Sequence, residues 1–342
     1  MSAEIPSESP EPSVAVVTPR RRKSQTREII ENSFGLVVVL VLLIGFFSFQ
    51  TDHFFSGTTF QAIANQIPTN IFVAIGMTFV LIIGGIDLSV GSVLALGGAV
   101  LGVALVQWHW PLWAGILLCL LIGAICGLIN GALTIRFQLP SFIVTLGLME
   151  AARGATYLVT NSQTMYIGSV VETVDNISLF GLSLPFFLAI ALVVFGQLVL
   201  SSTVFGRYLI ALGTNEEAVR LSGIDPRPVK LAVFTLSGTL AALGGVSYCA
   251  RLSSADPNAG SGFELAAIAA VVIGGTSLMG GRGSVINSLF GVLVIAVLEN
   301  GLAQLGAPES VKRLVTGAVI IVAVIVDFYR VRRADRKARA AG

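Results

Sequence analysis

Long apolar stretches follow one another along most of the chain, separated by short polar segments. A helix needs about 20 mostly apolar residues to cross the hydrocarbon core of a bilayer. The hydrophobic share of 54% and the charged share of 12% lie outside the range of soluble domains. We therefore predict an all-α polytopic membrane protein with about ten transmembrane helices, and with eight or nine as the alternatives. The fifth stretch is the weakest of the ten, because Glu150 and Arg153 interrupt it. The predicted spans are 34–50, 63–84, 90–107, 112–135, 140–160, 185–202, 229–250, 263–279, 284–304 and 311–329.

The basic residues orient this bundle. An even number of spans places both termini on one side of the membrane. If that side is the cytoplasm, 17 of the 21 Lys and Arg residues lie inside, and only Arg153, Arg251, Lys312 and Arg313 lie outside. This bias follows the positive-inside rule, because short basic loops resist translocation. We predict that both termini are cytoplasmic.

Two polar tails flank the membrane domain. Residues 1–33 contain four prolines and no apolar core, which predicts a disordered cytoplasmic tail rather than a signal peptide. The basic run Arg20–Lys23 is read as a stop that keeps this tail inside, not as a nucleic-acid contact. Residues 34–329 form the predicted membrane domain, and residues 330–342 form a basic cytoplasmic tail.

The sequence offers no enzyme active site. The three cysteines (Cys119, Cys126 and Cys249) lie in apolar stretches and form no CxxC pair, and His53 and His109 are isolated. No segment matches G-x-x-x-x-G-K-[ST], the loop that cradles nucleotide phosphates. We expect neither a metal site nor a cofactor bound by this chain.

An acidic residue interrupts the apolar stretches at Gly84-Gly85-Ile86-Asp87-Leu88-Ser89-Val90-Gly91-Ser92. The glycines permit a broken helix, which a membrane protein tolerates only where it lines a cavity or is buried in protein. One interpretation is that Asp87 caps the helix that begins near Ser89. The other is that Asp87 shapes a translocation pathway. The two interpretations do not exclude each other.

Further polar side chains within the spans suit a neutral, polyhydroxylated solute, which would be bound by amide and hydroxyl groups. With Asp87 and Ser89, the candidate pathway residues are Asn70, Asn130, Thr145 and Asn300. Glu150 and Arg153 are three residues apart, so on a helix they share a face and are predicted to pair. Such a pair either touches a polar solute or neutralises itself against neighbouring helices.

The polar loop 203–229 is the longest between spans and is predicted to be cytoplasmic. Thr214 and Glu217 have the spacing of a capping box. Gly223 suits the left-handed stop of a helix, and Pro226 cannot continue one. The pattern predicts a capped helix of about eight residues, roughly 12 Å long. A rigid helix of this kind is a suitable docking element for a cytoplasmic partner.

Several of these motifs together resemble the inner-membrane permease of ATP-driven monosaccharide importers, the ribose-type family. The resemblance covers residues 34–329 and includes Gly84–Ser92, Leu139–Gly147, Gly213–Gly223 and Ile273–Gly283, in the family's order. It implies a coupling helix over Asn215–Gly223, although Val219 stands where the family usually has a second alanine. The residues implied in coupling are Thr214, Asn215, Glu216, Glu217, Ala218, Arg220, Leu221 and Gly223.

The resemblance also implies partners. These are a second permease copy, a cytoplasmic ATPase that binds ATP and Mg²⁺, and a periplasmic or lipid-anchored sugar-binding protein, all at a bacterial inner membrane. Two alternatives remain open, namely a branched-chain amino acid permease of similar plan and an ion-coupled secondary transporter. The second alternative would use titratable residues within the spans, for which Asp87, Glu150 and Glu299 are the candidates.

Overall fold

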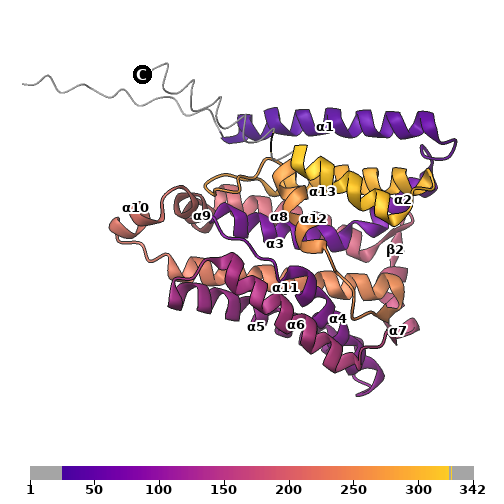
Figure 1. Ribbon diagram of the computed structural model, residues 1–342, viewed down its shortest axis with the longest axis horizontal. Helices are drawn as coiled ribbons and strands as arrows, with labels where there is room; N and C mark the ends of the chain where they lie inside the picture. The colour runs from indigo at the N-terminus through magenta and orange to yellow at the C-terminus, as the bar shows by residue number, and fades with distance from the viewer. Residues whose placement is uncertain (1–24, 323–324, 326–342) are drawn as a thin grey trace, which may run out of the picture.

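Helices make up almost all of the structure, as the sequence predicts for a polytopic membrane protein (Figure 1). The computed structural model describes residues 25–322 and residue 325, so the predicted basic tail 330–342 lies outside the described residues. The elements are α1 (Gln25–Gln50), α2 (Gly57–Gln66), α3 (Pro68–Ile82), α4 (Val90–Val106), α5 (Leu112–Phe137), α6 (Ser141–Thr160), β1 (Met165–Tyr166), α7 (Ser169–Asn176), β2 (Ser178–Leu179), β3 (Leu182–Ser183), α8 (Leu184–Ser202), α9 (Val204–Thr214), α10 (Glu216–Leu221), α11 (Arg227–Leu252), β4 (Ser254–Ala255), α12 (Phe263–Ile273) and α13 (Val285–Gln304). Residues 309–322 are also helical.

The predicted count of ten transmembrane helices is not confirmed by the described residues. Among the described residues, six helices are long and apolar enough to cross a membrane, or seven if the bent pair α2 and α3 is one span. This pair replaces the predicted span 63–84 and bends by 46°. Pro68 starts α3 at the bend, where its missing N–H costs no helical hydrogen bond. The predicted spans 90–107 and 263–279 contain the shorter helices α4 and α12, and the last predicted span is only partly described.

Helix α1 also differs from the predicted boundary. It begins at Gln25, inside the segment 1–33 that we predicted to be a disordered tail. An apolar stretch marks only the part of a helix that meets hydrocarbon, and a helix continues into polar residues when these are good helix formers, as Arg27 and Glu28 are. The predicted tail therefore extends too far along the chain, because the residues from Gln25 onward are helical.

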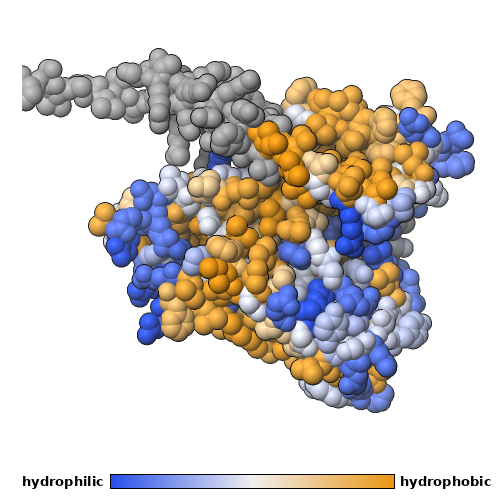
Figure 2. All heavy atoms as spheres, in the orientation of Figure 1, coloured by the Kyte–Doolittle hydropathy of each residue, from blue (hydrophilic) through white to orange (hydrophobic). Residues whose placement is uncertain are grey.

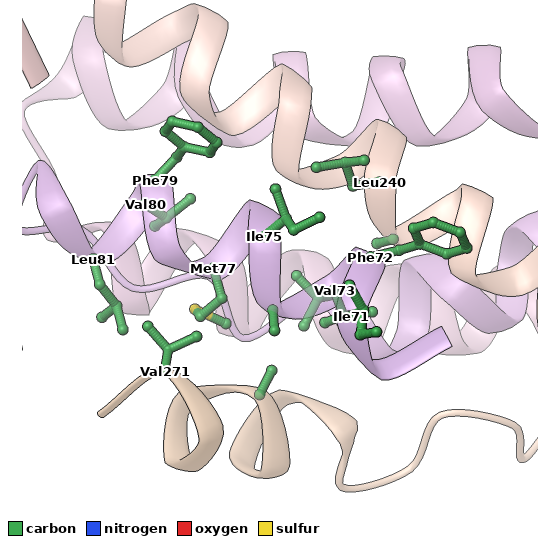
Figure 3. Close-up of a cluster of buried hydrophobic side chains, with 14 of the residues drawn as sticks. Ile71, Phe72, Val73, Ile75, Met77, Phe79, Val80, Leu81, Leu240 and Val271 are labelled. Carbon is green, nitrogen blue, oxygen red and sulfur yellow. The ribbon is translucent and has the colours of Figure 1, made fainter. Parts of the chain in front are cut away.

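Helix α3 forms the centre of the largest hydrophobic core. Fourteen of its fifteen residues are buried. Figure 3 shows α3 between α11 and α12, with Leu240 on the α11 side and Val271 on the α12 side. Because neighbouring helices cover α3 on almost every side, its packing fixes the positions of those neighbours.

Helices α5 and α11 pack along much of their length because small residues let their backbones approach closely. A Cβ added at Gly238 would lie 2.2 Å from the carbonyl oxygen of Gly123, and one added at Gly127 would lie 2.2 Å from the carbonyl oxygen of Phe234. In lipid, where no hydrophobic force drives helices together, such close packing is a main source of association. The position of α11 between α3 and α5 follows from this contact.

The two ends of the bundle differ. Helices α9 and α10 project from one end, and α2, α7 and the β2–β3 hairpin lie at the opposite end (Figure 1). Strands β1 and β4 pair antiparallel, with Tyr166 opposite Ser254. By the predicted orientation, the α10 end is cytoplasmic.

Candidate functional site

Asp87 lies in the irregular segment between α3 and α4, and its side chain is completely buried. Its Oδ1 accepts hydrogen bonds from the backbone N–H of Ser89 at 3.0 Å and from the Ser89 hydroxyl at 2.6 Å. Its Oδ2 accepts a bond from the hydroxyl of Ser237 on α11 at 2.8 Å. The carboxylate thus joins the start of α4 to α11.

Helices α5 and α6 complete this polar cluster. Asn130 Nδ2 donates to the hydroxyl of Ser89 at 2.9 Å. The hydroxyl of Thr145 accepts from the N–H of Leu88 at 3.1 Å and donates to the carbonyl oxygen of Ile86 at 3.2 Å. We call the group of Asp87, Ser89, Asn130, Ser141, Thr145 and Ser237 the Asp87 network, since the hydroxyl of Ser141 also accepts from the N–H of Ile86 at 2.9 Å.

The Asp87 network satisfies the backbone of a broken segment inside the bundle. Non-helical backbone at membrane depth requires partners from surrounding protein, because lipid offers none. The bond from Ser89 N–H to Asp87 is the contact that the capping interpretation predicts, although Ser89 itself occupies the cap position of α4. The same carboxylate is fully enclosed by protein, so in this conformation it faces no open pathway.

Four of the six predicted pathway residues therefore meet in one network, namely Asp87, Ser89, Asn130 and Thr145. The sequence reasoning missed Ser141 and Ser237. Ser141 stands within the Leu139–Gly147 motif, which was a usable signal. Ser237 is far from Asp87 in the chain, and no local pattern marks it.

Asn70 and Asn300 lie elsewhere. Asn70 is half-buried and lines a small, mostly apolar pocket between α3, α12 and α13, whose other lining residues are Val73, Phe263, Ala266, Ala267, Ala270, Val292 and Ile295. The Oδ1 atom of Asn300 accepts a bond from Gln304 Nε2, which also donates to Thr59 of α2. Their role in a pathway stays a prediction.

The predicted pair of Glu150 and Arg153 does not form in the described part of the chain. One guanidinium nitrogen of Arg153, Nη1, donates to the carbonyl oxygens of Pro257 and Ala259, at 2.7 and 2.8 Å. These carbonyls belong to the segment that leads into α12. The prediction was wrong because the spacing only places the two side chains on one face of the helix. In the structure, the guanidinium of Arg153 binds carbonyl oxygens of a distant segment instead of Glu150.

The predicted docking helix is present as α10, but its N-terminal cap differs from the prediction. Asn215 is the cap residue, and its Oδ1 accepts from the N–H of Ala218 at 2.9 Å. The hydroxyl of Thr214 instead donates to the carbonyl oxygen of Ile210 within α9. The capping box of Thr214 and Glu217 was therefore wrong, and α10 is shorter than the predicted eight residues.

The surface of α10 is charged and open. Glu217 pairs with Arg220 at 2.7 Å, an interaction that raises the pKa of the Arg220 guanidinium, and Glu216 pairs with Lys230 of α11. Leu221 is 79% exposed, whereas Val219 is buried. Gly223 has a φ of 85°, the left-handed conformation predicted for the stop. An exposed leucine beside paired charges is a surface that a protein partner can cover.

A close backbone contact links α10 to the end of α3. A Cβ added at Gly213, near the end of α9, would lie 1.8 Å from the carbonyl oxygen of Ile82 and 2.4 Å from the nitrogen of Gly281. The N–H of Gly281 donates to the same Ile82 oxygen at 2.9 Å. We call Ile82, Gly213 and Gly281 the Gly213 junction. It joins the base of α10 to the residue five positions before Asp87.

Comparisons with known proteins agree on one class. Residues 59–324 match the family described as the permease component of branched-chain amino acid transport systems. The ribose import permease protein of Haemophilus influenzae is 40% identical over 301 residues, which cover 85% of this chain and 92% of that protein. The fructose import permease protein of Rhizobium meliloti is 34% identical over 303 residues, 85% of this chain and 84% of that protein. The L-arabinose ABC transporter permease protein of Azospirillum brasilense is 34% identical over 324 residues, 94% of each chain. None of the solved structures matches.

Proposed function

Because the chain belongs to the family of permease components of branched-chain amino acid transport systems, in which its relatives are sugar permeases, we propose that it is the membrane subunit of an ATP-driven monosaccharide importer. The observation that carries this function is the similarity over most of the chain to permeases for ribose, fructose and arabinose. The branched-chain amino acid alternative shares the family, but these relatives favour a sugar.

The proposed assembly has two copies of this chain, a cytoplasmic ATPase and an external sugar-binding protein. Support for the ATPase contact comes from α10, which projects from the bundle with an exposed leucine and two acidic residues in its first turn. We place the complex in a bacterial inner membrane with both termini cytoplasmic, on the positive-inside bias. ATP and Mg²⁺ would bind to the ATPase.

In the proposed cycle, the binding protein delivers sugar from outside, and closure of the ATPase dimer moves α10. Since α10 is capped at Asn215 and tied to α11 through Glu216 and Lys230, it moves as a unit with its surroundings. The Gly213 junction carries this displacement to the end of α3 and towards the Asp87 network. The translocation pathway then closes on one side of the membrane and opens on the other.

The energy source separates this function from the ion-coupled alternative. We expect uptake of labelled ribose or xylose, in cells that express the full gene neighbourhood, to stop when ATP is depleted while a proton gradient is maintained. Collapse of the gradient with ATP preserved should leave uptake intact, and cells without this chain give the background. Loss of uptake only on gradient collapse would contradict the proposal and direct attention to Asp87, Glu150 and Glu299.

The docking role of α10 is tested by reversing one of its charges. We expect Glu217→Lys to abolish co-purification of the ATPase and to leave membrane insertion unchanged, because Glu217 is exposed and a surface ion pair contributes little to stability. Glu309→Lys is a matched control, since Glu309 is equally exposed, pairs with Lys312 and Arg313, and follows the end of α13 that contacts α2. Normal co-purification of the ATPase with Glu217→Lys would sink the assigned role.

A further inference from the structure

Glu150 is an acidic residue on the exposed surface of a membrane helix. It lies in the middle of α6, and its side chain is exposed. Arg153, the nearest basic residue along the helix, is occupied by the carbonyl oxygens of Pro257 and Ala259. Among the described residues, the Glu150 carboxylate has no hydrogen-bond or ion-pair partner. A carboxylate facing lipid is costly, so this position points to water or to a polar ligand.

The side of α6 that carries Glu150 combines small and polar residues with two exposed apolar ones, Ile143 and Leu146. Gly147, Gly154 and Tyr157 are three, four and seven residues away, so they lie on the same side of α6, which we call the Glu150 face. A Cβ added at Gly147 or Gly154 would meet no atom within 4 Å. Tyr157 is exposed, and its hydroxyl donates to Asn258 Oδ1 at 2.9 Å. Figure 2 shows hydrophilic and neutral atoms beside hydrophobic ones in the region where Figure 1 places the C-terminal half of α6.

Comparison with the other spans argues against lipid as the neighbour of this face. Of the six helices that can span a membrane, α6 has the lowest mean hydropathy, yet it is one of the two with the smallest buried share. Helix α5, in contrast, is the most apolar of the six and exposes leucines such as Leu117 and Leu121. A helix that leaves most of its surface outside the protein and faces lipid should be the most apolar, not the least.

We propose that the Glu150 face lines the aqueous sugar pathway and that the Glu150 carboxylate accepts hydrogen bonds from sugar hydroxyl groups. The inference rests on the proposed sugar-import function and deepens it. An ionised carboxylate has acceptor positions for two hydroxyls, and its hydrogen bonds are stronger than those between neutral groups. The open space beside Gly147 and Gly154 leaves room for a solute, and the ring of Tyr157 offers apolar surface next to a polar atom.

Cysteine labelling tests the pathway. The assembled complex, in sealed vesicles with the outer face accessible, is treated with a charged, membrane-impermeant thiosulfonate. We expect Gly154→Cys to react and saturating ribose to slow the reaction. Leu121→Cys on α5 is the matched control, which should stay unreactive in lipid. The unmodified chain is the blank, because its three cysteines are buried.

Substitution tests the carboxylate itself. Glu150→Leu should lower uptake at sub-saturating sugar about tenfold, the value of one hydrogen bond to a charged group. Glu150→Gln keeps one acceptor oxygen, so it should lower uptake less than Glu150→Leu does. Both variants should retain the membrane abundance and ATPase co-purification of the unmodified chain, since no hydrogen bond or ion pair joins Glu150 to the rest of the described residues.

The outcomes distinguish a failure of the pathway assignment from a failure of the sugar-import function. If the unmodified complex imports sugar and Gly154→Cys remains unlabelled with and without ATP, the pathway assignment is wrong and the import function stands. A disulfide between two Gly154→Cys copies without labelling would place this face in a dry contact between copies and also overturns the assignment. Labelling of Gly154→Cys without import of any monosaccharide by the unmodified complex would instead overturn the sugar function.

Discussion

Asp87→Ala should strongly destabilise the protein and abolish sugar uptake. The substitution removes the acceptor of three hydrogen bonds inside the bundle, from the N–H and hydroxyl of Ser89 and the hydroxyl of Ser237. A hydroxyl can rotate towards another acceptor, but the backbone N–H of Ser89 cannot. Each buried donor left without a partner costs about 1–3 kcal/mol. We expect the free energy of unfolding to fall by about 1–3 kcal/mol for the N–H of Ser89, and by more for each hydroxyl that finds no other acceptor; thermal unfolding of the purified permease measures this loss.

Two controls isolate the burial of this carboxylate. Asp225 accepts a hydrogen bond from the N–H of Arg227, the same two-residue spacing as Asp87 and Ser89, but in an exposed loop. Asp225→Ala should therefore change the unfolding midpoint little, because water replaces the lost acceptor. Asp87→Asn keeps the side-chain volume and one acceptor oxygen. Its unfolding midpoint should lie between that of Asp87→Ala and that of the unmodified chain. If Asp87→Ala unfolds and transports like the unmodified protein, the Asp87 network contributes neither to stability nor to uptake.

The asparagine variant also separates the two interpretations of Asp87. If the carboxylate only organises the start of α4, Asp87→Asn should retain a part of the uptake that matches its retained stability. A carboxylate that carries a proton or binds a cation needs its charge, so Asp87→Asn would then abolish uptake while the fold persists. Parallel measurement of unfolding and uptake in the same preparation distinguishes these cases.

The sequence predicted those features that the bilayer or the backbone conformation restricts locally. The apolar stretches around α5, α8 and α13 were predicted as helices, because a segment in hydrocarbon must satisfy its own backbone hydrogen bonds. The left-handed stop at Gly223 was predicted because few residues other than glycine adopt that conformation. The break between α3 and α4 was expected from Gly84-Gly85 beside an acidic residue. In each case the residue type and its immediate neighbours decide the structure.

Long-range contacts decided the rest. Thr214 and Asn215 are both good helix caps, and α9 decides between them, since it extends through Thr214 and takes its hydroxyl. Arg153 prefers two carbonyl oxygens about a hundred positions away to the carboxylate on its own helix. Ser237 completes the Asp87 network from α11. A single sequence does not predict these partners, because they depend on how the helices pack and not on local spacing.

Gly213→Ala should disconnect transport from the ATPase. Its Cβ would lie 1.8 Å from the carbonyl oxygen of Ile82, which no side-chain rotation can relieve, because both atoms belong to backbone regions fixed by packing. Overpacking of this kind costs about 1–3 kcal/mol. The end of α9 must therefore move away from α3 and Gly281, and the junction that links α10 to the bundle opens. We expect uptake per inserted permease to fall about tenfold or more, since each 1.4 kcal/mol changes an equilibrium tenfold.

The same variant should still bind the ATPase. The cap at Asn215 and the ion pair of Glu216 with Lys230 lie beyond the junction, so α10 keeps its own structure. Gly45→Ala in α1 is the matched control, because a Cβ there meets no atom within 4 Å, and it should leave uptake unchanged. Full uptake in Gly213→Ala would mean that the displacement of α10 reaches the Asp87 network by another route. Loss of ATPase binding would mean that the junction holds α10 in place rather than transmitting its movement. Retained binding with lost uptake is the result expected of a mechanical link at Gly213.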